Sequence, residues 1–112
     1  LFVECLAEKD FFPAAGQGAV GLEIRSGDEE TGIIIDALNH EETWNRVFAE
    51  REFLRLLDAG CSTPIGVWST LEGEHLEMAA RVFPEGSGMP RKTSASGVVP
   101  MEVAYQLFEN LK

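Results

Sequence analysis

The chain has 112 residues, which suits one modest hydrophobic core and leaves little room for two complete domains. Nineteen acidic and nine basic side chains give a formal net charge of -10, which argues against nucleic acid or an anionic membrane surface as a partner. Two cysteines are too few for a disulfide framework and no apolar run is long enough to span a membrane, so a soluble protein of the reducing cytoplasm is expected.

Leu1 opens a stretch that already has the character of structured sequence, which predicts that the chain is a piece of a longer protein. The acidic net charge would also repel an acidic metabolite. If the substrate carries carboxylates, most of the cations that hold it are therefore expected outside this chain.

The first part of the chain predicts a turn, a strand and a short helix. Residues 15–18 read A-G-Q-G and residues 19–24 read A-V-G-L-E-I, which is typical of a tight turn that leads into a strand. Ser26 and Glu29 have the spacing of a capping box ahead of an apolar run at 33–38. This spacing predicts a helix of about ten residues.

A second, longer helix is predicted over residues 40–57. Asn39 and Glu42 repeat the capping spacing at its start, and Ala59 with Gly60 ends it. Its apolar residues recur at helical spacing: Trp44, Val47, Phe48, Leu54 and Leu57. The two caps meet at residues 38–40, which indicates a domain boundary between 1–38 and 39–112.

The remaining elements predict a small sheet and a closing helix. Residues 65–71 and 76–83 are rich in strand-forming residues around a turn at 72–74, which predicts an antiparallel hairpin. Residues 91–97 predict a polar edge strand, and Pro100 opens an amphipathic helix. The order predicts an α+β fold in which helices cover one face of a three-stranded antiparallel sheet. One strand face should carry Leu76, Met78, Ala80 and Val82.

Cys61 follows the end of the second predicted helix in the loop D-A-G-C-S-T-P. The glycine and proline of such a loop constrain its backbone and can hold a thiol in an accessible position. A helix C-terminus carries negative partial charge and does not lower a thiol pKa, however, and free cysteines are commonly buried. Local chemistry therefore favours an inert structural cysteine over a reactive one.

Two further features have a functional and a structural interpretation. The G-Q-G turn at 16–18 can present backbone N–H groups to a polar or anionic ligand, although glycines that only supply positive φ explain it equally well. Arg25, at the end of the predicted strand, can bind a ligand carboxylate or pair with Asp28, Glu29 and Glu30. From the local sequence alone the surface ion pair is favoured.

The charged residues of the long predicted helix suggest no catalytic pair. Arg51 falls on the apolar stripe, so a half-buried arginine with a salt-bridge partner is expected there. The helix carboxylates are expected to form a solvated face; they are Glu41, Glu42, Glu50 and Glu52. Neither His40 nor His75 has a second ligand at metal spacing, so no metal site is predicted.

Four segments occur in one order along the chain: P-A-A-G-Q-G-A-V-G-L-E-I-R at 13–25, L-N-H-E-E-T at 38–43, A-E-R at 49–51 and G-C-S-T-P-I-G at 60–66. With these segments the chain resembles the porphobilinogen deaminases (hydroxymethylbilane synthases), closely over 13–72 and in pattern beyond. Many members read G-G-C-Q-V-P-I-G where this chain reads A-G-C-S-T-P-I-G, but the thiol and the proline remain.

The resemblance implies a three-domain enzyme of tetrapyrrole and heme biosynthesis. Such an enzyme joins four porphobilinogen molecules into hydroxymethylbilane, releasing ammonia at each step, and primes the chain on a dipyrromethane cofactor in thioether linkage to a cysteine. By position this cysteine is Cys61. The resemblance also implies that Gln17 and Gly18 border the cofactor cleft and that Arg25 is the basic end of the same strand.

The same resemblance implies how the chain is divided. Residues 1–38 would be a strand and helix of an upstream α/β domain, and 39–112 the small cofactor-carrying domain. The catalytic aspartate and most substrate-binding cations would lie upstream of Leu1, so no catalytic residue is assigned here and the fragment is expected to be inactive.

Its expected partners are porphobilinogen, the growing polypyrrole chain and the upstream domains, and its exposed apolar residues predict self-association. The alternative is a small non-catalytic α+β interaction or ligand-sensing module.

Overall fold

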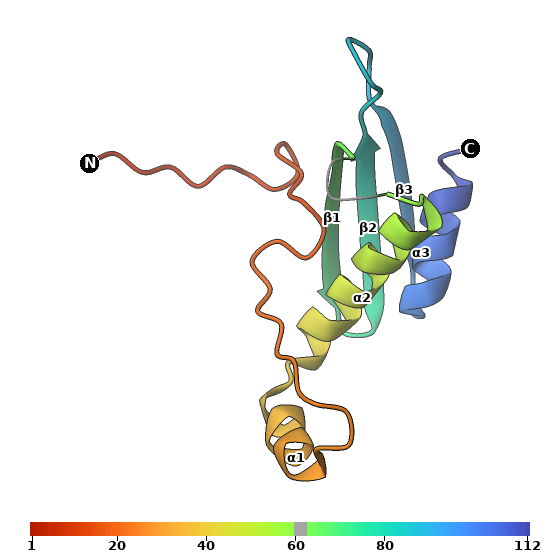
Figure 1. Ribbon diagram of the computed structural model, residues 1–112. Coiled ribbons are helices and arrows are strands. Elements are labelled where there is room, and N and C mark those ends of the chain that lie inside the picture. Colours follow the sequence, from red (N-terminus) through yellow and green to blue (C-terminus); the bar gives the residue numbers. More distant parts are fainter. Residues whose placement is uncertain (60–62) are drawn as a thin grey trace.

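The computed structural model describes residues 1–59 and 63–112. The elements follow the order α1 (Glu29–Leu38), α2 (Glu41–Leu56), β1 (Ile65–Glu72), β2 (His75–Val82), β3 (Arg91–Gly97) and α3 (Pro100–Glu109). The strands form one antiparallel sheet in the order β1-β2-β3, and α2 and α3 lie side by side over one of its faces (Figure 1). The predicted α+β fold is confirmed.

The core lies between this sheet and the two helices. Leu76, Met78 and Ala80 of β2 are at most 1% exposed, as their alternation predicted. Met78 pairs with Ser69 of β1 and with Ala95 of β3, so the same face of all three strands points to the helices. The helices contribute Ala49, Phe53, Val103, Ala104 and Leu107 to this core.

Both predicted helix caps are wrong by one or two residues. Asp28, not Ser26, caps α1, because its Oδ1 accepts the Thr31 N–H at 3.0 Å. His40 caps α2 by accepting the Thr43 N–H at 3.3 Å, whereas Asn39 is the C-cap of α1. Several residues able to cap stand close together at both places, and spacing alone does not choose among them.

The strand predicted at 19–24 does not form. These residues lack strand hydrogen bonds, and no other strand of 1–59 and 63–112 pairs with them. A strand needs a neighbour to satisfy its backbone groups, and period-2 apolar sequence cannot show whether one is present. Val20 is accordingly 88% exposed and Leu22 57% exposed.

Residues 9–16, here called the strap, run along the free edge of β1. The Val67 N–H donates to the Pro13 carbonyl at 2.8 Å, and the Arg81 guanidinium lies 4.2 Å from the centre of the Phe12 ring. Arg81 also donates to the carbonyl oxygens of Lys9 and Asp10. A segment distant in sequence is therefore attached to the sheet.

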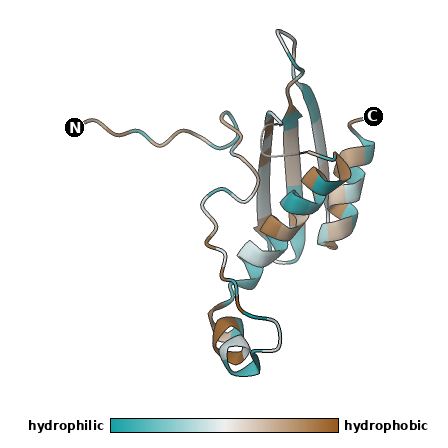
Figure 2. Ribbon diagram, viewed as in Figure 1, coloured by the Kyte–Doolittle hydropathy of each residue, from teal (hydrophilic) through white to brown (hydrophobic). Residues whose placement is uncertain are grey.

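Helix α1 stands apart from the sheet and carries apolar residues into solvent (Figures 1 and 2). Ile33 is 73% exposed, Ile34 59% and Leu38 67%. Across 1–59 and 63–112, no helix has both the length and the apolar character needed to cross a membrane.

Candidate functional site

Cys61 lies outside the described residues, together with Gly60 and Ser62. The chain on either side is well anchored. The Ala59 N–H donates to the Leu54 carbonyl at 3.0 Å after α2, and the Pro64 carbonyl accepts the Phe83 N–H at 3.0 Å before β1. Position 61 therefore falls in the connection between α2 and β1.

The predicted turn at residues 15–18 is present. Gly16 and Gly18 have φ angles of 70° and 83°, so both glycines are needed for the backbone conformation. The Gln17 N–H donates to the Ala14 carbonyl at 3.1 Å, and Gln17 Oε1 accepts the Ala14 N–H at 3.0 Å. This bond holds the Gln17 side chain on its own turn and leaves its Nε2 group on the surface.

Gly18 is the exposed end of this turn. No atom lies within 4 Å of the position that a Cβ would take there. Within 1–59 and 63–112 its N–H has no hydrogen-bond acceptor. The Gly18 N–H and the Gln17 Nε2 group are thus two donors available to a ligand.

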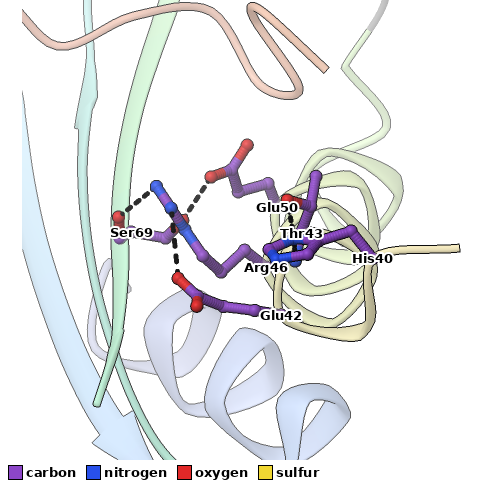
Figure 3. A network of polar contacts seen from close by, with 6 residues as sticks. All are labelled: His40, Glu42, Thr43, Arg46, Glu50 and Ser69. Carbon is purple, nitrogen blue, oxygen red and sulfur yellow. Dashed lines mark hydrogen bonds and ion pairs between the residues drawn. The ribbon is translucent and has the colours of Figure 1, made fainter. Parts of the chain in front are cut away.

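A polar network centred on Glu50 attaches this turn to α2 and β1 (Figure 3). Glu50 is only 7% exposed and its Oε2 accepts the Gly16 N–H at 2.7 Å. Its Oε1 accepts the hydroxyl of Ser69, which is 2% exposed. Arg46 supports Ser69 through Nε to Oγ at 3.1 Å and Nη2 to the carbonyl at 2.8 Å.

This network corrects two predictions. Glu50 was expected on a solvated face but is buried, because the strap and β1 cover its side of α2. Arg51 was expected to be half-buried with a partner but is exposed, since one residue further turns it about 100° around the helix. Arg46, one helical turn before Glu50, is the partly buried arginine instead and lies 3.9 Å from Glu42.

Arg25 is exposed and lies beside α1. Its carbonyl accepts the Asp28 N–H at 3.2 Å, while the adjacent Ile24 packs against Gly32 of α1. In the described part of the chain it makes no ion pair with the carboxylates that follow it, so that interpretation is wrong. Asp28 caps α1 instead, and hydrogen bonds from Thr31 lower its carboxyl pKa below the ordinary value of 3.8.

The predicted site residues are therefore attached to different elements. The Gly16–Gln17–Gly18 turn is fixed to α2 through Glu50, whereas the segment that ends at Arg25 packs on α1. The sequence interpretation missed Glu50, Ser69 and Arg46 as neighbours of the turn. The signal available was the spacing of Arg46, Glu50 and Phe53, which places the two charged residues beside a core phenylalanine.

Comparison with known proteins gives the family. Residues 44–111, from α2 to the end of α3, match the family model described as "Porphobilinogen deaminase, C-terminal domain". The chain belongs to the porphobilinogen deaminase family. The match includes the whole sheet, all of α3 and α2 from residue 44 onward.

Two porphobilinogen deaminases illustrate the similarity. The chain is 49% identical over 74 residues to the protein of Alkaliphilus metalliredigens (strain QYMF), covering 66% of this chain and 23% of that protein. It is 36% identical over 107 residues to that of Macrococcus caseolyticus (strain JCSC5402), covering 96% of this chain and 35% of that protein. The chain therefore spans about a quarter to a third of the length of these relatives.

Proposed function

We propose that this chain is the C-terminal part of a hydroxymethylbilane synthase, which joins four porphobilinogen molecules head to tail and releases ammonia at each step. The observation that carries the proposal is the family match over residues 44–111, a range that contains the G-C-S-T-P-I-G segment. We further propose that 39–112 is the cofactor-carrying domain, that 1–38 belongs to an upstream domain, and that the whole protein works in the cytoplasm.

In this proposal Cys61 holds a dipyrromethane cofactor through a thioether. Cys61 would hold the group through its sulfur, and a thiol would need no strong activation to capture an electrophilic azafulvene-like pyrrole. When bound, the cofactor supplies the pyrrole carbon to which the first porphobilinogen is joined. The chemistry of the residue at position 61 therefore fits the cofactor.

The described residues also fit the proposal that residues upstream of this chain bind the carboxylates of the substrate. Arg46 and Arg81 already donate to backbone carbonyls of this chain, and Arg55 pairs with Glu52 at 2.7 Å. Gln17 Nε2 and the Gly18 N–H are the neutral donors offered by the turn, and they would orient a polar edge of the cofactor. Arg25 would serve as a basic group at the border of the same cleft.

An assay of the full-length parent protein tests this function. Porphobilinogen consumption and ammonia release are measured for the wild type, for Cys61→Ser and for the matched control Cys5→Ser, since Cys5 is exposed and lies far from the family match. The wild type and Cys5→Ser should turn over substrate, and Cys61→Ser should fall to background. A folded wild type with no ammonia release would instead favour the non-catalytic binding module.

A further inference from the structure

Glu50 is a buried carboxylate that receives its hydrogen bonds from neutral groups. It is 7% exposed, and its two oxygens accept the Gly16 N–H and the Ser69 hydroxyl. Among residues 1–59 and 63–112 no cation lies within ion-pair distance of it, and Arg46 contacts it only through Ser69. Burying a carboxylate without a directly paired cation costs free energy that an apolar residue would not. Stability alone therefore does not account for this residue.

The Glu50 carboxylate joins three parts of the chain that differ widely in sequence position. Figure 3 shows Glu50 on α2 and Ser69 on β1. The third part is the exposed glycine turn, which begins at Gly16. Within the described residues, the Gly16 bond is the one hydrogen bond between this turn and α2. The turn is otherwise held by packing, with Val47 3.6 Å from the place of a Gly16 Cβ.

We propose that Glu50 is a positioning residue, whose carboxylate fixes the turn at residues 15–18 on α2 and β1. Through the Gly16 N–H it sets where the Gly18 N–H and the Gln17 Nε2 group point. Its consequence for the reaction rests on the proposed function, because these donors then face the cofactor. Whether Glu50 attaches the turn to α2 and β1 can be measured without an enzyme assay.

Two substitutions separate a positioning role from a stabilising one. In Glu50→Gln the amide oxygen can accept the Gly16 N–H while its NH2 group donates to Ser69, whose hydroxyl can rotate to accept it. In Glu50→Leu the side chain still fills the space but offers no acceptor. Glu52→Leu is the matched control on the same helix, since Glu52 pairs with its helix neighbour Arg55.

The first readout is hydrogen exchange of the Gly16 amide in the full-length parent protein, resolved by fragmentation of the peptide that spans the turn. Glu50→Leu should raise this exchange rate by about tenfold or more, because the amide loses its acceptor. Glu50→Gln and Glu52→Leu should leave it near the wild-type rate. An unchanged Gly16 exchange rate in Glu50→Leu would overturn the proposal.

The second readout is steady-state kinetics with porphobilinogen on the same proteins. Glu50→Leu should lower kcat by about tenfold to a hundredfold through misplacement, while KM stays within about twofold and Glu50→Gln restores kcat. An equal loss in Glu50→Gln and Glu50→Leu, or none in either, would overturn the positioning role. A wild type without turnover would contradict the proposed function, and the exchange data would then decide whether Glu50 holds the turn.

Discussion

At the scale of single residues, burial of Glu50 could not be read from the helix that carries it. Its partner Gly16 is 34 positions away in the sequence, so only the folded strap makes that side of α2 an interior one. The apolar stripe predicted for this helix is only partly buried: Trp44 is 61% and Phe48 40% exposed. Ala49 and Phe53, which the predicted stripe did not include, are fully buried instead. Whether a charged residue on this helix is buried depends on tertiary contacts, as it does for Glu50.

Gly66 tests the attachment of the strap. A Cβ at this position would lie 2.7 Å from the Phe12 Cβ and 2.9 Å from the Phe12 carbonyl oxygen, so the strap must shift in Gly66→Ala. We expect a loss of about 1–3 kcal/mol in the free energy of unfolding, measured by urea denaturation. Gly21→Ala is the control because no atom lies within 4 Å of its added Cβ. Equal stability of the two variants would contradict the close contact.

Asp28 predicts a pH dependence for α1. Thr31 hydrogen bonds lower its folded pKa below 3.8, so its stabilising effect is present above that pH and is lost as the pH falls through the lowered value. The Thr31 amide shift in an NMR titration between about pH 6 and 2 should follow this change. In Asp28→Asn, which keeps a capping oxygen, the titration should disappear. A Thr31 shift that titrates equally in both proteins would exclude Asp28 as its source.

At the scale of elements, local patterns predicted those structures whose partners are close in sequence. The β1–β2 hairpin contains its own turn residues and α3 has Pro100 at its first position, and both formed as predicted. The segment 19–24 has the strand pattern but pairs with no strand in the described part of the chain, and the caps of α1 and α2 depended on a choice among adjacent polar residues. Strand pairing and helix capping depend on three-dimensional contacts that a local sequence pattern does not show.

Thr93 joins β3 to α3 and tests how firmly the closing helix is held. Its hydroxyl donates to the Leu107 carbonyl at 2.7 Å in a buried position. Thr93→Val should lower the free energy of unfolding by about 1–3 kcal/mol, since a buried acceptor loses its donor. Ser96→Val, an exposed position on the same strand, is the control. A smaller effect in Thr93→Val than in Ser96→Val would show that this bond does not stabilise the docking.

At the scale of the whole molecule, the family and the candidate site residues were predicted from the family resemblance, and hydrophobic periodicity predicted only helices and strands. Cys61, Gln17, Gly18 and Arg25 were chosen as site residues from segments in register, and family membership has been established while their roles stay predictions. The apolar surface expected on residues 1–38 is largely present, although Phe12 packs on the sheet and Ile35 is half-buried. An exposed apolar surface of this kind is typical of an interaction site.

This apolar surface predicts self-association of the isolated chain. Val20, Ile33 and Ile34 are each more than half exposed. Sedimentation velocity at about 1–50 µM should show oligomers that diminish in the double variant Ile33→Ser, Ile34→Ser. Met101→Ser, which removes an exposed residue of α3, should leave them unchanged. A monodisperse monomer across this range would contradict an unpartnered docking surface.

Peptide mapping with intact mass measurement can show whether Cys61 carries the proposed cofactor. The full-length parent protein is made in a cytoplasm that produces porphobilinogen, alongside Cys61→Ser. We predict an added mass of two pyrrole units on the peptide that contains Cys61, and its absence from Cys61→Ser. An unmodified Cys61 in the folded wild-type protein would contradict the assignment of Cys61 as the cofactor site.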